Sequence, residues 1–305
     1  MSISPELRSQ LDKICKGQIT YDAPMSRHTS FKIGGPADAL AEPETTAQIV
    51  QIIDACHRFS TPFFVMGNGS NLLVSDSGIR AVVIKCDENF SSVRVDGLTV
   101  TAESGILLSK LANIAADAGL SGLEFAAGIP GTLGGAVYMN AGAYDGEMRS
   151  VVTSTTYFDP ADGKIHTLEG EAHQFDYRRS FFSGGDKVIL TSTISLRPGI
   201  SAEIRAKMND FNARRRDKQP LSLPSCGSTF KRPAGHYAGA LIQDCGLMGY
   251  AVGGAAVSTK HAGFVVNNGG ATAADVRALI AHIQREVKAK FNVELECEVK
   301  IIGFD

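Results

Sequence analysis

The sequence predicts a mixed α/β protein built from two domains. Its 305 residues exceed the usual length of one small domain. Before residue 198, segments with helical hydrophobic spacing alternate with short apolar runs that are typical of strands, and after Gly199 the composition shifts to a charged helix. We therefore expect an N-terminal domain over 1–198, with a subdomain that ends near residue 86, and a smaller α/β domain over 199–305.

Helices are expected early in the N-terminal domain and strands late. In 45–58, Ile49, Ile52, Ile53 and Cys56 lie on one helical face behind a threonine cap. A second apolar face of this kind ends at Gly119. The expected elements are helices over 45–58 and 104–118, strands over 61–66, 81–86, 151–158 and 187–196, and a hairpin turn over 159–164.

Two helices and a terminal strand are expected in the C-terminal domain. Residues 201–218 form a charged helix, and 272–290 form a helix that Thr272 caps, with Asp275 in its first turn. Apolar and polar residues alternate over 293–302, which predicts a half-buried strand.

The composition is that of a soluble globular protein, and the cysteine pattern with the N-terminal sequence leads us to expect a cytoplasmic one. A net charge of −2 gives no electrostatic reason to expect nucleic acid or an anionic membrane as a partner. The N-terminus lacks the apolar block of a secretory signal. The six cysteines match no zinc spacing or disulfide framework, so we expect reduced thiols and no metal site.

An uncharged, glycine-rich segment covers residues 125–143. It is long enough to span a membrane, but five glycines and Pro130 leave few apolar side chains to meet lipid and make a poor helix. We therefore expect irregular backbone whose N–H groups are open to an anionic ligand with a phosphate bridge.

A second glycine-rich stretch, "GNGSN" at 67–71, follows a strand. It is neither a Walker loop nor a dinucleotide fingerprint leading into a helix. Taken alone it is equally a plain turn between two strands. Together, the two glycine-rich segments favour a large ligand with an extended phosphate bridge.

Four further features carry candidate chemistry, each beside a plainer interpretation. Ser228, in "SCGSTFKRP", follows a glycine with no Ser-His-Asp pattern around it, so its plainer interpretation is a turn hydroxyl. Arg178, in "YRRS", is a substrate clamp or a surface residue. Glu298 shares its strand face with other acidic residues, and the pattern does not distinguish it from them. The basic run 214–218 is a solvated helix end or a phosphate contact.

Taken in order, these motifs resemble the UDP-N-acetylenolpyruvoylglucosamine reductase (MurB) family. The resemblance runs from "HTSFKIGGPA" at 28–37 to "ELECEVKIIG" at 294–303 and includes "GNGSNLLV", "YRRSFF" and "KQPLSLPSCGSTFKRP". It implies an α+β or α/β fold: an FAD-binding domain of the vanillyl-alcohol-oxidase (PCMH) type, followed by a smaller α/β substrate-binding domain.

The resemblance also implies a non-covalent FAD, because neither glycine-rich loop contains a histidine that could tether it. NADPH is the implied hydride donor, and a UDP-sugar is the implied substrate, taken up by a cytoplasmic monomer. The residues implied to bind FAD are Gly67, Asn68, Gly69, Ser70, Asn71, Gly128, Pro130, Gly131, Thr132, Gly134 and Gly135.

The implied reaction reduces an enolpyruvyl ether to a lactyl ether during peptidoglycan synthesis. The hydride goes from flavin N5 to C3 of the enolpyruvyl group, and C2 is then protonated. The motif matches imply that Ser228 donates this proton. They also imply that Arg178 and Glu298 stabilise the enolic carboxylate. Tyr177, Lys218 and Arg232 are implied to bind the substrate.

The chain departs from the family pattern at three places. The short stretch between Arg178 and Lys218 lacks the tyrosine-bearing loop of the longer subclass, so the residue that closes over the nucleotide is not identified. Arg232 stands where some members have asparagine, and Lys300 where many have arginine. Two alternatives remain: an FAD-dependent alcohol or sugar oxidase, and a UDP-sugar-binding module without flavin.

Overall fold

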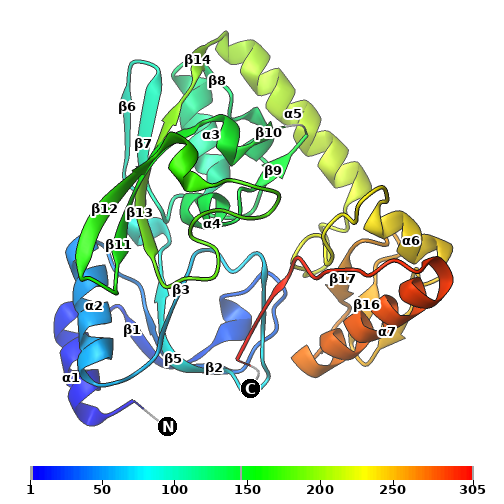
Figure 1. Cartoon of the computed structure of the whole chain (residues 1–305), viewed down its shortest axis with the longest axis horizontal. Helices are drawn as coiled ribbons and strands as arrows, with labels where there is room; N and C mark the ends of the chain where they lie inside the picture. The colour runs from blue at the N-terminus through cyan, green and yellow to red at the C-terminus, as the bar shows by residue number, and fades with distance from the viewer. Residues whose placement is uncertain (1–2, 145, 304–305) are drawn as a thin grey trace. The chain divides into compact units, whose positions relative to one another are not determined.

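The computed structural model describes residues 3–144 and 146–303, which form two compact units (Figure 1). Each unit is assembled from three stretches of chain. The first comprises Met1–Tyr21, Ala39–Asn68 and Ala81–Arg215, and the second comprises Asp22–Asp38, Gly69–Arg80 and Arg216–Asp305. The predicted division into 1–198 and 199–305 stays a prediction about functional domains.

Near the beginning of the chain, two helices pack beside a small sheet. The helices are α1 (Pro5–Ile14) and α2 (Thr46–Arg58), and the sheet has the order β1 (Ile19–Pro24), β2 (Pro36–Ala41), β5 (Ile79–Lys85) and β3 (Phe63–Met66), with β3 parallel to β5. The predicted helix over 45–58 is confirmed. The hydroxyl of Thr45 accepts from the N–H of Gln48 at 3.2 Å, and Ile49, Ile52 and Ile53 are buried beneath it.

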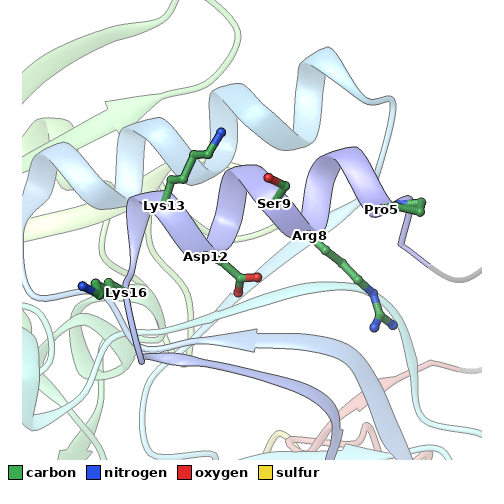
Figure 2. Close-up of a pocket in the computed structure, with 6 residues that line it drawn as sticks. All are labelled: Pro5, Arg8, Ser9, Asp12, Lys13 and Lys16. Atoms are coloured by element: carbon green, nitrogen blue, oxygen red, sulfur yellow. The ribbon is translucent and has the colours of Figure 1, made fainter.

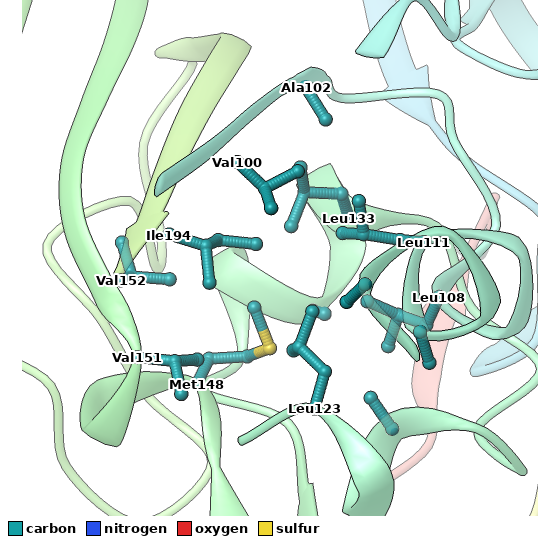
Figure 3. Packing of buried hydrophobic residues seen from close by; sticks show 14 of the residues in the cluster. Val100, Ala102, Leu108, Leu111, Leu123, Leu133, Met148, Val151, Val152 and Ile194 are labelled. Atoms are coloured by element: carbon teal, nitrogen blue, oxygen red, sulfur yellow. The ribbon is translucent and has the colours of Figure 1, made fainter. Parts of the chain in front are cut away.

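A five-stranded antiparallel sheet forms the larger part of the first unit. Its order is β12 (Lys164–Glu169), β11 (Val152–Asp159), β13 (Val188–Ser195), β7 (Thr99–Glu103) and β6 (Val93–Asp96), and the predicted hairpin at 159–164 joins β11 to β12. Helices α3 (Leu108–Asp117) and α4 (Leu133–Tyr138) cover one face of it (Figure 1). In Figure 3, Leu108, Leu111 and Leu133 from these helices meet Val100 and Ile194 of the sheet.

The glycine-rich segment contains a short helix, so the prediction of wholly irregular backbone over 125–143 was wrong. Helix α4 forms because Leu133, Ala136 and Val137 recur at helical spacing and are all buried. Tertiary burial thus outweighs the low helix propensity of Gly134 and Gly135. A 3-10 turn at Glu124–Ala126 precedes it, and residues 127–132 between them are irregular.

The second unit has a core of two helices on a small antiparallel sheet. Helices α6 (Ala238–Asp244) and α7 (Ala273–Phe291) share one apolar cluster with β15 (Ala251–Val252), β16 (Ala255–Val257) and β17 (Val265–Asn267). The predicted cap of α7 is confirmed. Thr272 and Asp275 form a reciprocal capping box, and both carboxylate oxygens of Asp76 accept from the N–H groups of Ala273 and Ala274, at 2.8 and 3.0 Å.

The C-terminal strand is shorter than the predicted 293–302. Only β18 (Lys300–Ile302) pairs as a strand, parallel to β4 (Leu72–Val74), and an isolated bridge joins Cys297 to Phe230. The alternation of buried and exposed residues is nevertheless present, because Leu295 and Val299 are buried. The remaining elements are helix α5 (Ser201–Lys218), strands β8 (Leu120–Ser121), β9 (Gly142–Ala143), β10 (Gly146–Glu147) and β14 (Arg197–Pro198), and 3-10 turns at Met25–Arg27, Glu88–Phe90, Met148–Ser150 and Gly170–His173.

Among residues 3–144 and 146–303, no helix is both long and apolar enough to cross a bilayer. The cysteine side chains form no disulfide there, and all six are free thiols.

Candidate functional site

Within the first unit, the beginning of the glycine-rich loop at 67–71 lies against the glycine-rich segment at 125–143. The side-chain amide of Asn68 donates to the carbonyl of Pro130 at 2.6 Å. A Cβ on Gly67 would lie 2.0 Å from the hydroxyl oxygen of Thr132, which is closer than any side chain allows. The backbone of Gly67 therefore packs directly on Thr132, and this contact depends on the missing side chain.

Neighbouring elements fix the glycine-rich segment on both sides. The N–H groups of Leu133 and Gly134 donate to the carbonyls of Ile106 and Ser104, both at 2.8 Å. From α5, the guanidinium of Arg215 donates to the carbonyl of Gly128, and burial lowers the pKa of Arg215. Part of the basic run at 214–218 therefore supports the loop, while Arg214 pairs with Asp210 at 2.7 Å.

The exposed backbone of these loops fits a ligand with a phosphate bridge. In the described parts of the chain, the N–H groups of Gly67, Asn68 and Gly131 donate to no protein acceptor. N–H groups on glycine-rich backbone bind phosphate oxygens without interference from side chains. The donor set in the first unit thus matches the pyrophosphate of a dinucleotide such as FAD.

Arg178 lies in a tight turn of the same unit. Asp176 and Arg179 exchange two backbone hydrogen bonds, at 3.0 and 3.1 Å, and the carboxylate of Asp176 accepts from the N–H of Tyr177 at 2.7 Å. Arg178 is half-buried and has a left-handed backbone with φ of 54°, and its guanidinium lies 5.0 Å from the ring centre of Tyr177. A left-handed arginine is uncommon, and such positions concentrate at functional sites.

The turn with Arg178 is bound to the glycine-rich segment. The amide of Asn140 donates to the carbonyl of Asp176 at 3.1 Å, and the hydroxyl of Ser180 donates to the carbonyl of Tyr138 at 2.6 Å. Asn140 was not among the predicted site residues. No signal pointed to it, because the helix that it follows was itself not predicted, although asparagine is favoured after a helix since it tolerates a left-handed backbone.

In the second unit, the segments that carry Ser228 and Glu298 lie side by side. The N–H of Glu298 donates to the carbonyl of Thr229 at 2.9 Å, and the N–H of Lys231 donates to the carbonyl of Glu296 at 2.8 Å. Ser228 is exposed and Glu298 is half-buried. Ser228, the predicted proton donor, is therefore the residue next to Thr229, whose carbonyl binds the backbone of Glu298.

Two polar side chains hold these segments in place. Thr229 is buried, and its hydroxyl accepts from the N–H of Val265 at 3.0 Å. The side-chain amide of Asn71 donates to the carbonyl of Glu298 at 3.0 Å. The backbone carbonyl of Asn71 accepts from the N–H of Lys300 at 2.9 Å. Asn71, predicted as a cofactor ligand, therefore contacts the backbone beside Glu298. Thr229 was missed because an isolated threonine carries no sequence signal.

The other predicted substrate ligands are exposed side chains of the second unit. Lys218 is the last residue of α5 and is exposed. The guanidinium of Arg232 lies 3.9 Å from the ring centre of Tyr237, which is 63% exposed. This distance is that of a cation–π contact, so Arg232 presents its charge beside an aromatic ring.

A depression of about 700 Å³ lies along α1, away from every predicted site residue. It is lined by Pro5, Arg8, Ser9, Asp12, Lys13 and Lys16 (Figure 2). Figure 2 shows these side chains diverging from the helix. A ligand site needs polar groups that converge, so we assign this depression no role.

Two family models match the chain. Residues 37–169 match an FAD binding domain, and residues 219–302 match the C-terminal domain of UDP-N-acetylenolpyruvoylglucosamine reductase. The chain is 52% identical over 285 residues to the UDP-N-acetylenolpyruvoylglucosamine reductase of Alkaliphilus metalliredigens, covering 93% of both, and 50% identical over 287 residues to that of Clostridium perfringens, covering 94% of both.

The chain belongs to the UDP-N-acetylenolpyruvoylglucosamine reductase family. The fold agrees. The crystal structure of the family enzyme from Thermus caldophilus superposes with a TM-score of 0.79 at 34% identity, covering 94% of this chain and 98% of that one. The predicted fold, an FAD-binding domain of the vanillyl-alcohol-oxidase type followed by the family's C-terminal domain, is confirmed. The chain is an FAD-dependent oxidoreductase of peptidoglycan synthesis that uses NADPH.

Proposed function

We propose that this chain works as a cytoplasmic monomer and that three of its side chains carry the second half of the reaction. Its small-molecule substrate is a UDP-sugar with an enolpyruvyl ether, which is reduced to the lactyl ether of UDP-N-acetylmuramate. The pairing of the Ser228 and Glu298 segments, held by the 2.9 Å bond between Glu298 and Thr229, is the observation that supports this proposal most directly.

Ser228 is proposed to donate the proton to C2. When bound, FAD supplies the hydride, which it takes from NADPH and passes to C3 of the enolpyruvyl group. The resulting enolic carbon is a strong base, so a hydroxyl is acidic enough if it is held at the right place. Ser228 follows Gly227, which has a left-handed φ of 77°, and precedes the buried Thr229, so a tight turn and a fixed residue define its position.

Arg178 and Glu298 are proposed to stabilise the enolic carboxylate. A guanidinium presents paired N–H donors to a carboxylate, and its attraction grows as negative charge accumulates there. A carboxylic acid at Glu298 donates a further hydrogen bond when it is protonated. Bonds to Asn71 and Thr229 hold the Glu298 backbone on both sides, which reduces the motion that would otherwise weaken such a contact.

The cofactor and the substrate diphosphate are proposed to bind at separate groups of residues. FAD is held without a covalent bond by the loops at 67–71 and 128–135, through backbone N–H groups. Lys218 contacts the diphosphate, and Tyr177 and Arg232 line the substrate site. In this proposal residues 1–198 form the FAD-binding domain, which also carries Tyr177 and Arg178, and residues 199–305 form the substrate-binding domain.

Stopped-flow absorbance of the flavin tests the proposed function. NADPH added under nitrogen should bleach the flavin, and the enolpyruvyl substrate added next should restore its absorbance. Restoration by oxygen with an alcohol or sugar as the reductant, and no response to NADPH, would identify an oxidase instead. A preparation that stays colourless after incubation with FAD would indicate a binding module.

A further inference from the structure

Asn140 is a buried polar residue with an unusual backbone, and the proposed chemistry does not use it. It is 1% exposed, has a left-handed φ of 43°, and follows α4 at the end of the glycine-rich segment. Burial of an amide is costly unless the group is hydrogen-bonded. The structure therefore has to satisfy this side chain.

Its amide makes three hydrogen bonds that fix its orientation. The Nδ2 group donates to Glu147 Oε2 at 2.9 Å and to the carbonyl of Asp176 at 3.1 Å, and Oδ1 accepts from the N–H of Arg149 at 2.9 Å. A flipped amide would direct Nδ2 at the Arg149 N–H and Oδ1 at two acceptors. The three partners thus admit one orientation.

One of these partners belongs to the turn that carries the proposed carboxylate ligand. The carbonyl of Asp176 precedes Tyr177 and Arg178, and Asp176 closes the turn through its two bonds with Arg179. Ser180 fixes the far side of the turn to Tyr138. Tyr138 is the last residue of α4, and Asn140 lies two residues after it. Both ends of the turn are therefore held by the C-terminal end of this helix.

We propose that Asn140 is a positioning residue that holds the Tyr177–Arg178 turn, so that the Arg178 guanidinium meets the carboxylate of the substrate. This inference rests on the role proposed above for Arg178. Asn140 acts only through the backbone at Asp176. Because a displacement of about 1 Å at a reacting group can lower a rate by roughly 100-fold, loosening this anchor should affect the step that needs Arg178.

If Asn140 only ended helix α4, its side-chain amide would not be needed. Asparagine is common in the left-handed position after a helix, and glycine serves there equally well. An aspartate keeps the shape, but its carboxylate cannot donate to Asp176 and would face the carboxylate of Glu147, which already pairs with Arg149 at 2.6 Å. Asn140→Gly and Asn140→Asp therefore separate the cap from the anchor.

The test measures the two half-reactions of the FAD-loaded protein separately. For both variants, flavin reduction by NADPH should stay within about twofold of the unmodified protein, and reoxidation by the enolpyruvyl substrate should fall by roughly 100-fold. Asn113→Asp is the matched control, because Asn113 is an exposed residue of α3 whose amide donates to the carbonyl of Ser109 at 2.8 Å and accepts from Arg205 at 3.4 Å. FAD content and circular dichroism check that each variant is folded.

A double-mutant cycle with Arg178→Ala decides whether Asn140 acts through the arginine. Adding Asn140→Asp to Arg178→Ala should change reoxidation by less than about twofold, since residues that act as one unit are not additive. An undiminished loss in that background, or an equal loss of both half-reactions in the single variants, would overturn the positioning role.

Normal reoxidation by Arg178→Ala would reject the proposed function of the arginine, and the inference with it. Defective Arg178→Ala with normal Asn140 variants would reject the inference alone.

Discussion

Single residues at this site are held mainly by the backbone of their neighbours. Ser228 and Glu298 owe their placement to the carbonyl of Thr229, and Arg178 owes its placement to a turn closed between Asp176 and Arg179. The motifs around all three were visible in the sequence. Their supports were not, because Thr229 and Asn140 act through hydrogen bonds to residues far along the chain.

Removal of the Ser228 hydroxyl should slow only the second half-reaction. We expect Ser228→Ala to lower flavin reoxidation by roughly 100- to 1000-fold, the usual cost of losing one well-placed donor in an active site, while reduction by NADPH is retained. Stopped-flow absorbance reports both rates. Ser222→Ala, at an exposed position of the same segment, should leave them unchanged. An equal fall of both rates in Ser228→Ala would show that the serine is not the proton donor.

At the scale of elements, local signals predicted the long helices well and the glycine-rich segment less well. Caps and apolar periodicity gave α2 and α7 because Thr45 and Thr272 bond to their own helices. Helix α4 was missed because packing of Leu133 and Val137 against a distant sheet overrides local propensity. The alternation of apolar and polar residues also predicted a terminal strand that is too long. A strand needs a neighbouring strand to pair with, and this pattern does not show where one is present.

The contact between Gly67 and Thr132 should be necessary for cofactor binding. A Cβ at Gly67 would overlap the Thr132 hydroxyl, so in Gly67→Ala the Thr132 side chain has to shift. We expect this shift to disturb the loop contact and to weaken FAD affinity by about tenfold, which corresponds to about 1.4 kcal/mol. Fluorescence titration of the flavin-free protein with FAD measures this. Gly185→Ala is the control, because no atom lies within 4 Å of its Cβ and its φ is unstrained. Equal affinities for FAD would mean that the loops do not form the pyrophosphate site.

Helix α7 should depend on Asp76 as well as on its own capping box. Both carboxylate oxygens of Asp76 accept from the first N–H groups of the helix, where the helix dipole also favours negative charge. We expect Asp76→Ala to lower the free energy of unfolding by about 1 kcal/mol, measured by urea denaturation. Asp54→Ala, on the exposed face of α2, should change it by less than about 0.5 kcal/mol. Indistinguishable stabilities for the two variants would rule out this second cap.

At the scale of the whole molecule, the chain does not divide into two consecutive pieces. The second unit takes Asp22–Asp38 and Gly69–Arg80 from the N-terminal part of the chain. Composition could not reveal this, because it changes only near Gly199. These two segments belong to the second unit because their side chains and backbone contact its core. Phe31, Leu73 and Asp76 contribute to the core or the helix cap of the second unit, where the carbonyl of Phe31 accepts from the amide of buried Asn267 at 3.1 Å.

Each unit also contains a histidine whose pKa is lowered by burial, which makes stability depend on pH. His173 is fully buried, with Nδ1 at 2.8 Å from the carbonyl of Gly170 and Nε2 at 2.9 Å from the hydroxyl of Thr155, and burial lowers its pKa below 6.5. In the second unit, burial lowers the pKa of His261 as well, and its Nδ1 accepts from the N–H of Gly263 at 3.1 Å.

The sign of the pH effect follows from these lowered pKa values. Below pH 6.5 the unfolded chain takes up protons on both histidines before the folded protein does, so the free energy of unfolding should fall as the pH drops from 6.5 through the folded pKa values. Glu124 and Asp275 have pKa values lowered from 4.5 and 3.8, so their contributions are lost only at more acidic pH. Urea denaturation of the FAD-loaded protein at pH 7.5 and 5.5 measures the difference, and His261→Gln should reduce it. A free energy of unfolding that is constant or rises on acidification would show that folding lowers the pKa of neither histidine.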